Sequence, residues 1–352
     1  MRTVQVKTSS PYEVRIGTAL TGEAGQAFGE LFAPCKVCLL TDDMVDALYA
    51  PIVEKSLQQA GFQVYTYTIS HGEASKCGPV YLSLLNFLAD NGFSRTDVLA
   101  ALGGGVVGDL GGFTAATYLR GIRYVQLPTT VLAMVDSSVG GKTAIDLPAG
   151  KNLCGAFWQP ALVLCSTDTA DTLPREIFAD GMAEVIKYGV IRDESLFRHL
   201  QENGTSFDRD YVISRCVEIK RDIVEADEFD NGERQLLNFG HTVAHAVEKL
   251  SGYALSHGRA VAMGMAVMGR CAAREGLWSQ EEAQALCRLT EAFGLPTQCP
   301  YSPAQMAQVL LSDKKRRGGT ITLVLPRRLG QAELCPTPVE ACEALLAKGV
   351  EG

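Results

Sequence analysis

The sequence predicts an α/β domain with a largely parallel sheet, followed by a helical domain. In the first half, short apolar segments alternate with helical patterns, which is the order that produces a parallel sheet covered by helices. From Leu173 onward the pattern is mostly helical, and only the β-rich run Thr320–Leu325 interrupts it. We therefore expect residues 1–170 to form the α/β domain and residues 171–352 the helical domain.

The elements follow from short apolar runs for strands and from longer helical patterns for helices. The expected strands of the first domain are Thr3–Lys7, Glu13–Ile16, Lys36–Thr41, Gln63–Ile69, Asp97–Leu102, Arg123–Leu127 and Leu162–Cys165. Its expected helices are Met44–Gln59, Val80–Asn91 and Val106–Leu119. The expected helices of the second domain are Arg175–Val190, Asp193–Glu202, Asp210–Asp227, Leu236–Leu250, Gly258–Glu275, Ser279–Phe293 and Pro303–Ser312.

Composition restricts the possible partners and the compartment. The formal net charge of −8 argues against nucleic acid or an anionic membrane as a partner, so an anionic substrate must meet a local basic cluster. The N-terminus has no apolar signal region, and no apolar run reaches the ~18 residues that a membrane helix needs. Several of the eleven cysteines lie in apolar segments. We expect them to be free thiols in a reducing cytoplasm.

A glycine run follows the apolar segment Val98–Leu102. Three consecutive glycines, Gly103–Gly105, allow a sharp turn into a helix whose free N–H groups and positive end can bind an anion. The GxGxxG pattern is present, but the acidic residue usually found about 20 residues further on is not evident. Asp42, at a strand end, stands where ribose hydroxyls are often held. We interpret the turn as an unusual dinucleotide site, with a tight turn that binds no ligand as the alternative.

Histidines and one acidic residue indicate a metal site in the second half. Three of the five histidines fall between 241 and 257, and His241 and His245 share one helical face. On another helix, Glu184 and Lys187 lie one turn apart among apolar neighbours, which favours a buried role over a surface ion pair. Two histidines and one glutamate would leave a zinc position open for catalysis. Spacing alone leaves open which two histidines bind the metal.

Basic residues gather around these motifs. Individually each fits a solvated surface charge, but in an acidic chain their grouping suggests a pocket for a multiply charged anion. They are Arg120, Lys142, Lys151, Lys187, Lys220, Arg234, Lys314 and Lys315.

Taken together, the motifs resemble those of the 3-dehydroquinate synthase family of sugar-phosphate cyclases. The matching stretches are GGGVVGDLGGFTAATYLRG, QLPTTVLAMVDSSVGGKTAID, GKN, AEVIKYG, and LNFGHTVAHAVE followed by SHG. They occur in the family's order over nearly the whole chain. The resemblance implies a Rossmann-like N-terminal domain that binds NAD, an all-α metal-binding C-terminal domain, a site in the cleft, and a homodimer.

The resemblance also implies a role for individual residues. NAD would be held by Asp42, Glu73, Lys76, Gly104, Gly105, Val106, Asp109, Thr129, Thr130, Asp136, Lys142, Lys151, Thr169 and Thr172. A divalent metal, zinc or alternatively cobalt, would be bound by Glu184, His241 and His257. The substrate would meet Lys142, Asn152, Lys187, Lys220, Arg234, Asn238, His245 and Lys314. Arg120 would reach the substrate phosphate across the dimer interface.

The implied reaction converts 3-deoxy-D-arabino-heptulosonate 7-phosphate to 3-dehydroquinate and phosphate. Transient oxidation at C5 by NAD acidifies the C6 proton, so that phosphate leaves by β-elimination. The hydride then returns, the ring opens, and an intramolecular aldol step closes the carbocycle. The metal polarises the C5 hydroxyl, and the basic cluster orients both anionic ends of the substrate.

Two positions depart from the family's usual pattern, and three other functions are open. Ala244 replaces a frequent glycine, and Arg259 replaces a usual glutamate and adds positive charge near the metal loop. The first alternative is a cyclase that makes 2-deoxy-scyllo-inosose or an epi-valiolone, against which Lys220, Arg234 and Asn238 favour a carboxylated substrate. The second is a metal-dependent polyol dehydrogenase, which would release NADH. The third is a non-catalytic protein with the same fold.

Overall fold

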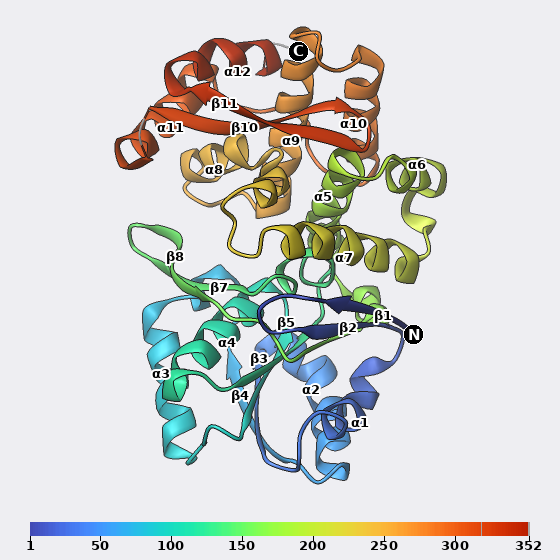
Figure 1. Cartoon of the computed structure of the whole chain (residues 1–352), viewed down its shortest axis with the longest axis vertical. Coiled ribbons are helices and arrows are strands. Elements are labelled where there is room, and N and C mark those ends of the chain that lie inside the picture. The colour runs from blue at the N-terminus through green and yellow to red at the C-terminus, as the bar shows by residue number, and fades with distance from the viewer. Residues whose placement is uncertain (318, 351–352) are drawn as a thin grey trace. The chain divides into compact units, whose positions relative to one another are not determined.

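The structure is a computed structural model that describes the backbone of residues 1–317 and 319–350 and the side chains of residues 1–311 and 319–350. The chain forms two compact units. The first unit contains Met1–Leu173 and Arg209–Phe229, and the second contains Pro174–Asp208 and the chain from Asp230 onward. This division differs from a single boundary near residue 170, because the helix α7 (Arg209–Ala226) belongs to the first unit (Figure 1).

A seven-stranded sheet forms the centre of the first unit. Its order is β1-β2-β9-β6-β5-β3-β4, and only the edge pair β1–β2 is antiparallel. The strands are β1 (Arg2–Val6), β2 (Tyr12–Gly17), β3 (Lys36–Asp42), β4 (Gln63–Ile69), β5 (Val98–Gly103), β6 (Arg123–Pro128) and β9 (Leu162–Ser166). The largely parallel sheet predicted from the alternating pattern is therefore confirmed.

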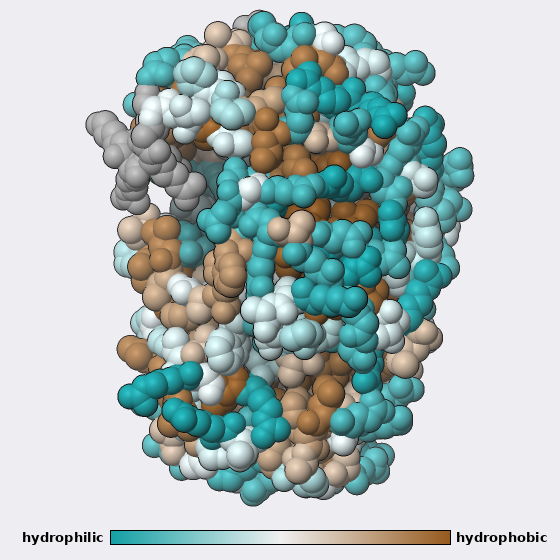
Figure 2. Space-filling model, in the orientation of Figure 1, coloured by the Kyte–Doolittle hydropathy of each residue, from teal (hydrophilic) through white to brown (hydrophobic). Residues whose placement is uncertain are grey.

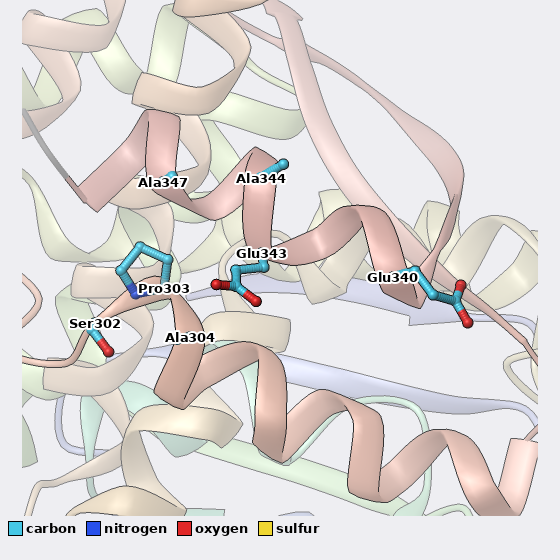
Figure 3. Close-up of a pocket in the computed structure, with 7 residues that line it drawn as sticks. All are labelled: Ser302, Pro303, Ala304, Glu340, Glu343, Ala344 and Ala347. Carbon is cyan, nitrogen blue, oxygen red and sulfur yellow. The ribbon is translucent and has the colours of Figure 1, made fainter.

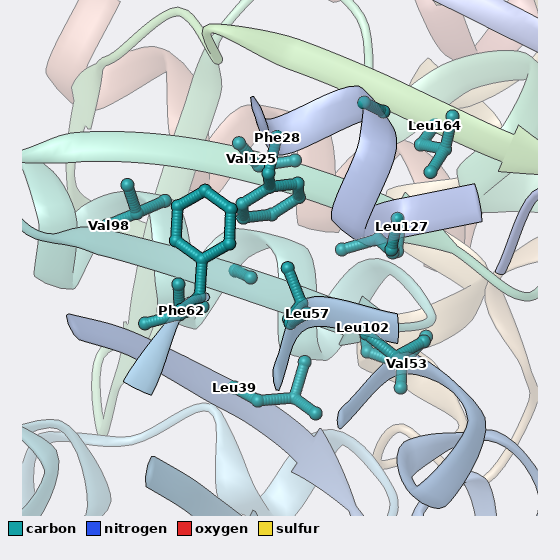
Figure 4. Packing of buried hydrophobic residues seen from close by; sticks show 14 of the residues in the cluster. Phe28, Leu39, Val53, Leu57, Phe62, Val98, Leu102, Val125, Leu127 and Leu164 are labelled. Carbon is teal, nitrogen blue, oxygen red and sulfur yellow. The ribbon is translucent and has the colours of Figure 1, made fainter. Parts of the chain in front are cut away.

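Helices pack on both faces of this sheet, which explains why its central strands β5 and β9 are apolar and buried along their whole length. Val37 and Leu39 of β3 pack in one cluster with residues of α1 (Ala24–Gly29) and α2 (Asp43–Gln59) (Figure 4). Cys38 and Leu40 of the same strand pack in a second cluster with residues of α3 (Gly78–Asp90) and α4 (Gly105–Thr117). Alternate residues of one strand therefore fill two separate cores.

An antiparallel hairpin that the sequence does not predict follows β6 in the first unit. A short π-helical turn, Ala133–Ser137, leads toward its strands β7 (Lys142–Leu147) and β8 (Gly150–Phe157). No position of β8 is fully buried, so the strand lacks the alternation of apolar and polar residues that marks a half-buried strand. The hairpin carries three residues of the predicted site: Lys142, Lys151 and Asn152.

The second unit is largely helical, as predicted, and it also contains the hairpin β10–β11. Of this hairpin only the first strand is expected from the sequence. The helices are α5 (Arg175–Ile191), α6 (Glu194–Asn203), α8 (His241–Leu250), α9 (His257–Arg274), α10 (Gln280–Ala292), α11 (Pro303–Arg317) and α12 (Cys342–Val350). The strands are β10 (Thr320–Arg328) and β11 (Gln331–Pro338).

A close approach of two backbones fixes the start of α8. The single helix predicted over residues 236–250 is interrupted, because Gly240 has a left-handed φ of 80° and α8 begins only at His241. A Cβ atom at Gly264 of α9 would lie 2.0 Å from the Gly240 carbonyl oxygen. Glycine at position 264 therefore allows α9 to touch the turn that carries His241.

Replacing Gly264 with alanine is expected to destabilise the protein by about 1–3 kcal/mol, because the added methyl group overlaps a backbone atom that cannot move freely. Denaturant unfolding of the variant and of Gly29→Ala would test this. Position 29 is also helical, but no atom lies within 4 Å of a Cβ built there. Equal free energies of unfolding for the two variants would contradict the close approach.

Hydrophilic residues cover much of the face shown in Figure 2, with apolar residues between them. Among the described residues, no helix is both long and apolar enough to span a bilayer.

Candidate active-site residues

The glycine run of the first unit forms the strand–turn–helix that the sequence predicts. Gly103 ends β5, Gly104 is the N-cap of α4, and Gly105 is its first helical residue. The loop after β6 lies against this turn, since Thr129 N–H donates to the Gly103 carbonyl at 3.0 Å. A Cβ atom at Gly104 would lie 3.1 Å from the Thr130 side chain. The carboxyl ends of two neighbouring strands thus bring four predicted cofactor residues together.

Asp42 and Thr169, two other predicted cofactor residues, also have local structural roles. The Asp42 carboxylate caps α2, because its Oδ1 accepts from the backbone N–H groups of Met44 and Val45 at 3.0 Å. Both bonds use one oxygen, so a second ligand at Oδ2 is compatible with the cap. Thr169 is buried, its hydroxyl donates to the Ser166 carbonyl at 2.9 Å, and its own carbonyl accepts from the Thr172 hydroxyl at 3.0 Å.

Lys76 is the centre of a charge cluster in the first unit. Its ammonium Nζ lies 3.0 Å from Asp109 Oδ2, 3.2 Å from Glu73 Oε1 and 2.7 Å from Asn152 Oδ1. Asp146, which is not in the predicted set, accepts from the Asn152 N–H at 2.8 Å. Burial raises the pKa of Asp109 to about 6, although the charge of Lys76 opposes the rise. The cluster therefore connects three parts of the first unit: the turn that precedes α3, the helix α4 and the β7–β8 hairpin.

Lys220 shows why α7 belongs to the first unit. Its ammonium donates to the Asp136 carboxylate at 2.8 Å and to the Asp136 carbonyl at 2.6 Å. Lys220 is buried, and Asp136 lies in the π-helical turn before the hairpin. Two residues predicted to bind different molecules, the substrate and NAD, are therefore in direct contact. Arg120 is exposed at the end of the short helix Tyr118–Arg120.

In the second unit, Glu184, His241 and His257 form a group with the spacing of metal ligands. Their ligand atoms all lie within 4.8 Å of one another. Glu184 Oε1 is 3.4 Å from His241 Nε2 and 3.6 Å from His257 Nε2. Two ligand atoms that are each about 2.1 Å from a tetrahedral zinc ion lie roughly 3.4 Å apart, so the spacing fits such an ion.

The three residues of this group differ in the exposure of their side chains, and the two histidines differ in the direction of their pKa shifts. The side chain of Glu184 is 0% exposed, that of His241 13% and that of His257 34%. Burial lowers the pKa of His241 to about 3, and nearby Lys187 acts in the same direction. Burial would also lower the pKa of His257, but hydrogen bonds with Glu184 and Glu248 outweigh it and raise the value to about 10.

The remaining predicted residues of the second unit differ in exposure. Lys187 is buried and forms an ion pair with Glu184, so this pair is not a surface salt bridge. Arg234 is buried in the 3-10 helix Glu233–Asn238, whereas Asn238 and His245 are exposed. The His241 and His245 rings have centroids 6.0 Å apart, and those of His241 and His257 are closer, at 5.2 Å. The predicted substrate residue Lys314 lies outside the described side chains.

Two acidic residues near the metal-ligand group are missing from the predicted set. Glu248 Oε1 lies 3.5 Å from His257 Nδ1, and Asp180 accepts a hydrogen bond from Ser256 at 2.7 Å. The sequence spacing could have indicated Glu248, because this residue follows His241 by two helical turns and therefore lies on the same face of the helix. Burial raises the pKa of Asp180, and Ser256, His257 and the half-buried Arg259 oppose the rise.

An open depression in the second unit lies elsewhere, between the beginning of α11 and the segment around α12 (Figure 3). It is lined by Ser302, Pro303, Ala304, Glu340, Glu343, Ala344 and Ala347. None of these residues belongs to the predicted site, so we assign no chemistry to this depression.

Comparison with known proteins decides the family. A model of the 3-dehydroquinate synthase N-terminal region matches residues 66–180, and a model of the C-terminal region matches residues 181–316. A 3-dehydroquinate synthase of Streptococcus suis (strain 05ZYH33) is 43% identical over 339 residues, which cover 94% of this chain and 96% of the relative. The chain belongs to the 3-dehydroquinate synthase family. The resemblance inferred from the motifs is therefore confirmed.

Solved structures confirm the fold expected of the 3-dehydroquinate synthase family. The 2-epi-5-epi-valiolone synthase of Streptomyces hygroscopicus subsp. jinggangensis 5008, with NAD+ and Zn2+ bound, has a TM-score of 0.88 and 26% identity, covering 100% of this chain and 99% of that one. A 2-deoxy-scyllo-inosose synthase complexed with carbaglucose-6-phosphate, NAD+ and Co2+ has a TM-score of 0.87 and 22% identity, covering 99% and 100%.

Proposed function

We propose that this member of the 3-dehydroquinate synthase family converts 3-deoxy-D-arabino-heptulosonate 7-phosphate to 3-dehydroquinate and phosphate, as a lyase of the shikimate pathway of aromatic amino acid biosynthesis. The observation that carries the proposal is the group formed by Glu184, His241 and His257 with Lys187 beside it. A buried ammonium next to three metal ligands suits a substrate that carries both hydroxyl and anionic groups. The relative in Streptococcus suis, which bears this enzyme's name, supports the same assignment.

The two units would divide the work between them. We assign NAD binding to the first unit, at the turn of Gly104 and Gly105 and the cluster around Lys76, and metal binding to Glu184, His241 and His257 in the second. When bound, NAD would supply reversible hydride acceptance, and a divalent metal would supply polarisation of the C5 hydroxyl. The residues of the chain would bind and orient the substrate, since its phosphate and carboxylate need several cations.

Individual basic residues fit these orienting roles to different degrees. Lys187 is already directed to the metal-ligand group by its ion pair with Glu184. Lys220 is held by Asp136, so its ammonium is fixed before any substrate arrives. Asn152 is held between Asp146 and Lys76, in a left-handed conformation with a φ of 56°. Residues held in this way lose little conformational entropy when they bind a ligand.

Further details of the proposal rest on the family resemblance. We propose zinc as the metal, with cobalt as the alternative, and a homodimer in which Arg120 reaches the phosphate bound by the partner. The exposed position of Arg120 is compatible with such a role. We also propose a cytoplasmic location, which suits the eleven free cysteines.

Phosphate release with catalytic NAD is the test of the proposed function. The metal-loaded protein is expected to release phosphate from 3-deoxy-D-arabino-heptulosonate 7-phosphate without net accumulation of NADH, because the hydride returns to the substrate. Phosphate would be followed by a coupled assay and NADH by its absorbance. Failure to release phosphate from this substrate would refute the proposal.

Two other activities would give different results in the same assay. A related cyclase would release phosphate from glucose 6-phosphate or would act on sedoheptulose 7-phosphate, and the similarity of fold to two such cyclases is the reason to include these substrates. A polyol dehydrogenase would accumulate NADH with a simple polyol and release no phosphate. The buried cations Lys187, Lys220 and Arg234 favour the phosphorylated, carboxylated substrate over a polyol.

A further inference from the structure

We propose that Asp180 and Glu248, two acidic residues outside the ligand set, are positioning residues that hold His257 as the third metal ligand. The inference rests on the metal site of the proposed function and extends it to residues without an assigned role. His257 needs such support more than the other ligands, because its side chain is the most exposed of the three. In addition, His257 is the first residue of α9, whereas the other two ligands lie on α5 and α8.

Glu248 sets the orientation of the His257 ring. Its side chain is 4% exposed, and its Oε1 lies 3.5 Å from His257 Nδ1 on the side of the ring away from Glu184. A carboxylate only accepts hydrogen bonds, so in the neutral imidazole that binds a metal this contact favours the tautomer with its proton on Nδ1. The lone pair of Nε2 then faces Glu184, where a metal ligand is needed.

His241 shows the same arrangement with a different acceptor. Its Nδ1 lies 3.2 Å from the Phe239 carbonyl oxygen, which also only accepts, and its Nε2 lies 3.4 Å from Glu184 Oε1. Both imidazoles therefore present Nε2 to the same carboxylate oxygen while an oxygen contacts Nδ1. For His241 the acceptor belongs to the neighbouring backbone, whereas for His257 it must come from another helix.

Asp180 fixes the backbone on both sides of His257. It lies one helical turn before Glu184 on α5, so both carboxylates occupy the same face. On one side of His257, Ser256 Oγ donates to the Asp180 carboxylate at 2.7 Å. On the other side, a Cβ atom at Gly258 would lie 2.3 Å from the Asp180 carbonyl oxygen. The first turn of α9 thus rests directly on the helix that carries Glu184.

These contacts predict that metal affinity depends on both acidic residues. Replacing Glu248 with alanine is expected to weaken zinc binding by about 10–100-fold, because the ring loses the partner that sets its orientation. Glu248→Gln keeps an acceptor oxygen and is expected to recover most of the affinity. Asp180→Ala is expected to weaken binding as well, whereas Asp180→Asn retains an acceptor for Ser256.

The experiment measures the zinc dissociation constant of the full chain by competition with a chromophoric chelator, together with the electronic spectrum of the cobalt-loaded protein. A changed spectrum in Glu248→Ala reports on ligand geometry, which a loss of general stability would not alter. The matched control is Glu282→Ala on α10, because this glutamate holds another segment of the second unit by accepting from the Leu329 N–H at 3.0 Å, away from the metal-ligand group.

The possible results separate the inference from the proposed function. Unchanged zinc affinity and an unchanged cobalt spectrum in Glu248→Ala and Asp180→Ala would overturn the positioning role, as would an equal loss of affinity in Glu282→Ala. Absence of zinc and cobalt binding by the unsubstituted protein would instead overturn the metal site, and the inference with it. Weakened binding in Glu248→Ala, restored by Glu248→Gln, would support the positioning role.

Discussion

Replacing His257 with alanine is expected to abolish stoichiometric metal binding and phosphate release, while NAD still binds. The variant retains only Glu184 and His241 of the three ligands whose donor atoms lie within 4.8 Å of one another. Two ligands from this group do not provide the three protein ligands of a catalytic zinc site. The proposed NAD residues lie in the first unit, so their local structure does not depend on this imidazole. Zinc content after dialysis and calorimetric titration with NAD would measure the two effects.

His245→Ala is the matched control, because it removes an imidazole from the same helix as His241. Its side chain is exposed and its ring lies further from His241 than the ring of His257 does. We expect this variant to retain stoichiometric zinc. Zinc retained by His257→Ala, or lost from His245→Ala, would overturn the ligand assignment.

Replacing Lys76 with methionine is expected to lower the free energy of unfolding by about 3 kcal/mol near pH 8, since removal of one partner leaves buried charge uncompensated. The value is at the low end of the usual range because Glu73 is 41% exposed. The loss would be measured by chemical denaturation. The loss of unfolding free energy is expected to be smaller near pH 5, because Asp109 is then largely protonated and carries less uncompensated charge.

Asp109 determines the sign of this pH dependence. Burial already raises its pKa from 3.8 to about 6 while Lys76 opposes the rise, and loss of Lys76 would raise it further. A carboxyl with a raised pKa contributes stability in its protonated form, and this contribution disappears as pH increases through the folded-state value. The deficit of Lys76→Met therefore grows with pH. Adding Asp109→Asn should reduce it, and an equal deficit at both pH values would contradict the explanation.

Local patterns predicted the elements whose burial is visible in the sequence. The parallel strands β3 and β5 are apolar runs that alternate with helices, and both signals follow from cores on the two faces of the sheet. The β7–β8 hairpin lacks such a signal, because none of the β8 residues is fully buried. The interruption of the helix at Gly240 was also not predicted from the sequence, because it accompanies a close contact with Gly264 of another helix.

The metal-ligand group shows the same limit of local patterns. Spacing placed His241 and His245 on one helical face, but only the fold brings His257 to Glu184. The resemblance to family motifs implied these three ligands, but it did not show how their side chains approach one another. Helical spacing places Glu248 two turns after His241 and on the same face. It was not predicted to be part of the site, because a glutamate on a helix is normally solvated. Its burial against His257 arises from tertiary packing.

The return of α7 to the first unit has a consequence for synthesis on the ribosome. Glu228 accepts hydrogen bonds from Ser9 and Gln159, Thr167 bonds to Asp210, and Lys220 holds the turn at Asp136. The nascent chain emerges from its N-terminus, so the first unit lacks these partners until residue 229 has left the exit tunnel. By then residues 174–208 of the second unit have already been made. The two units are therefore completed in alternation, and release of the chain at residue 173 would leave an α/β sheet without one of its own helices.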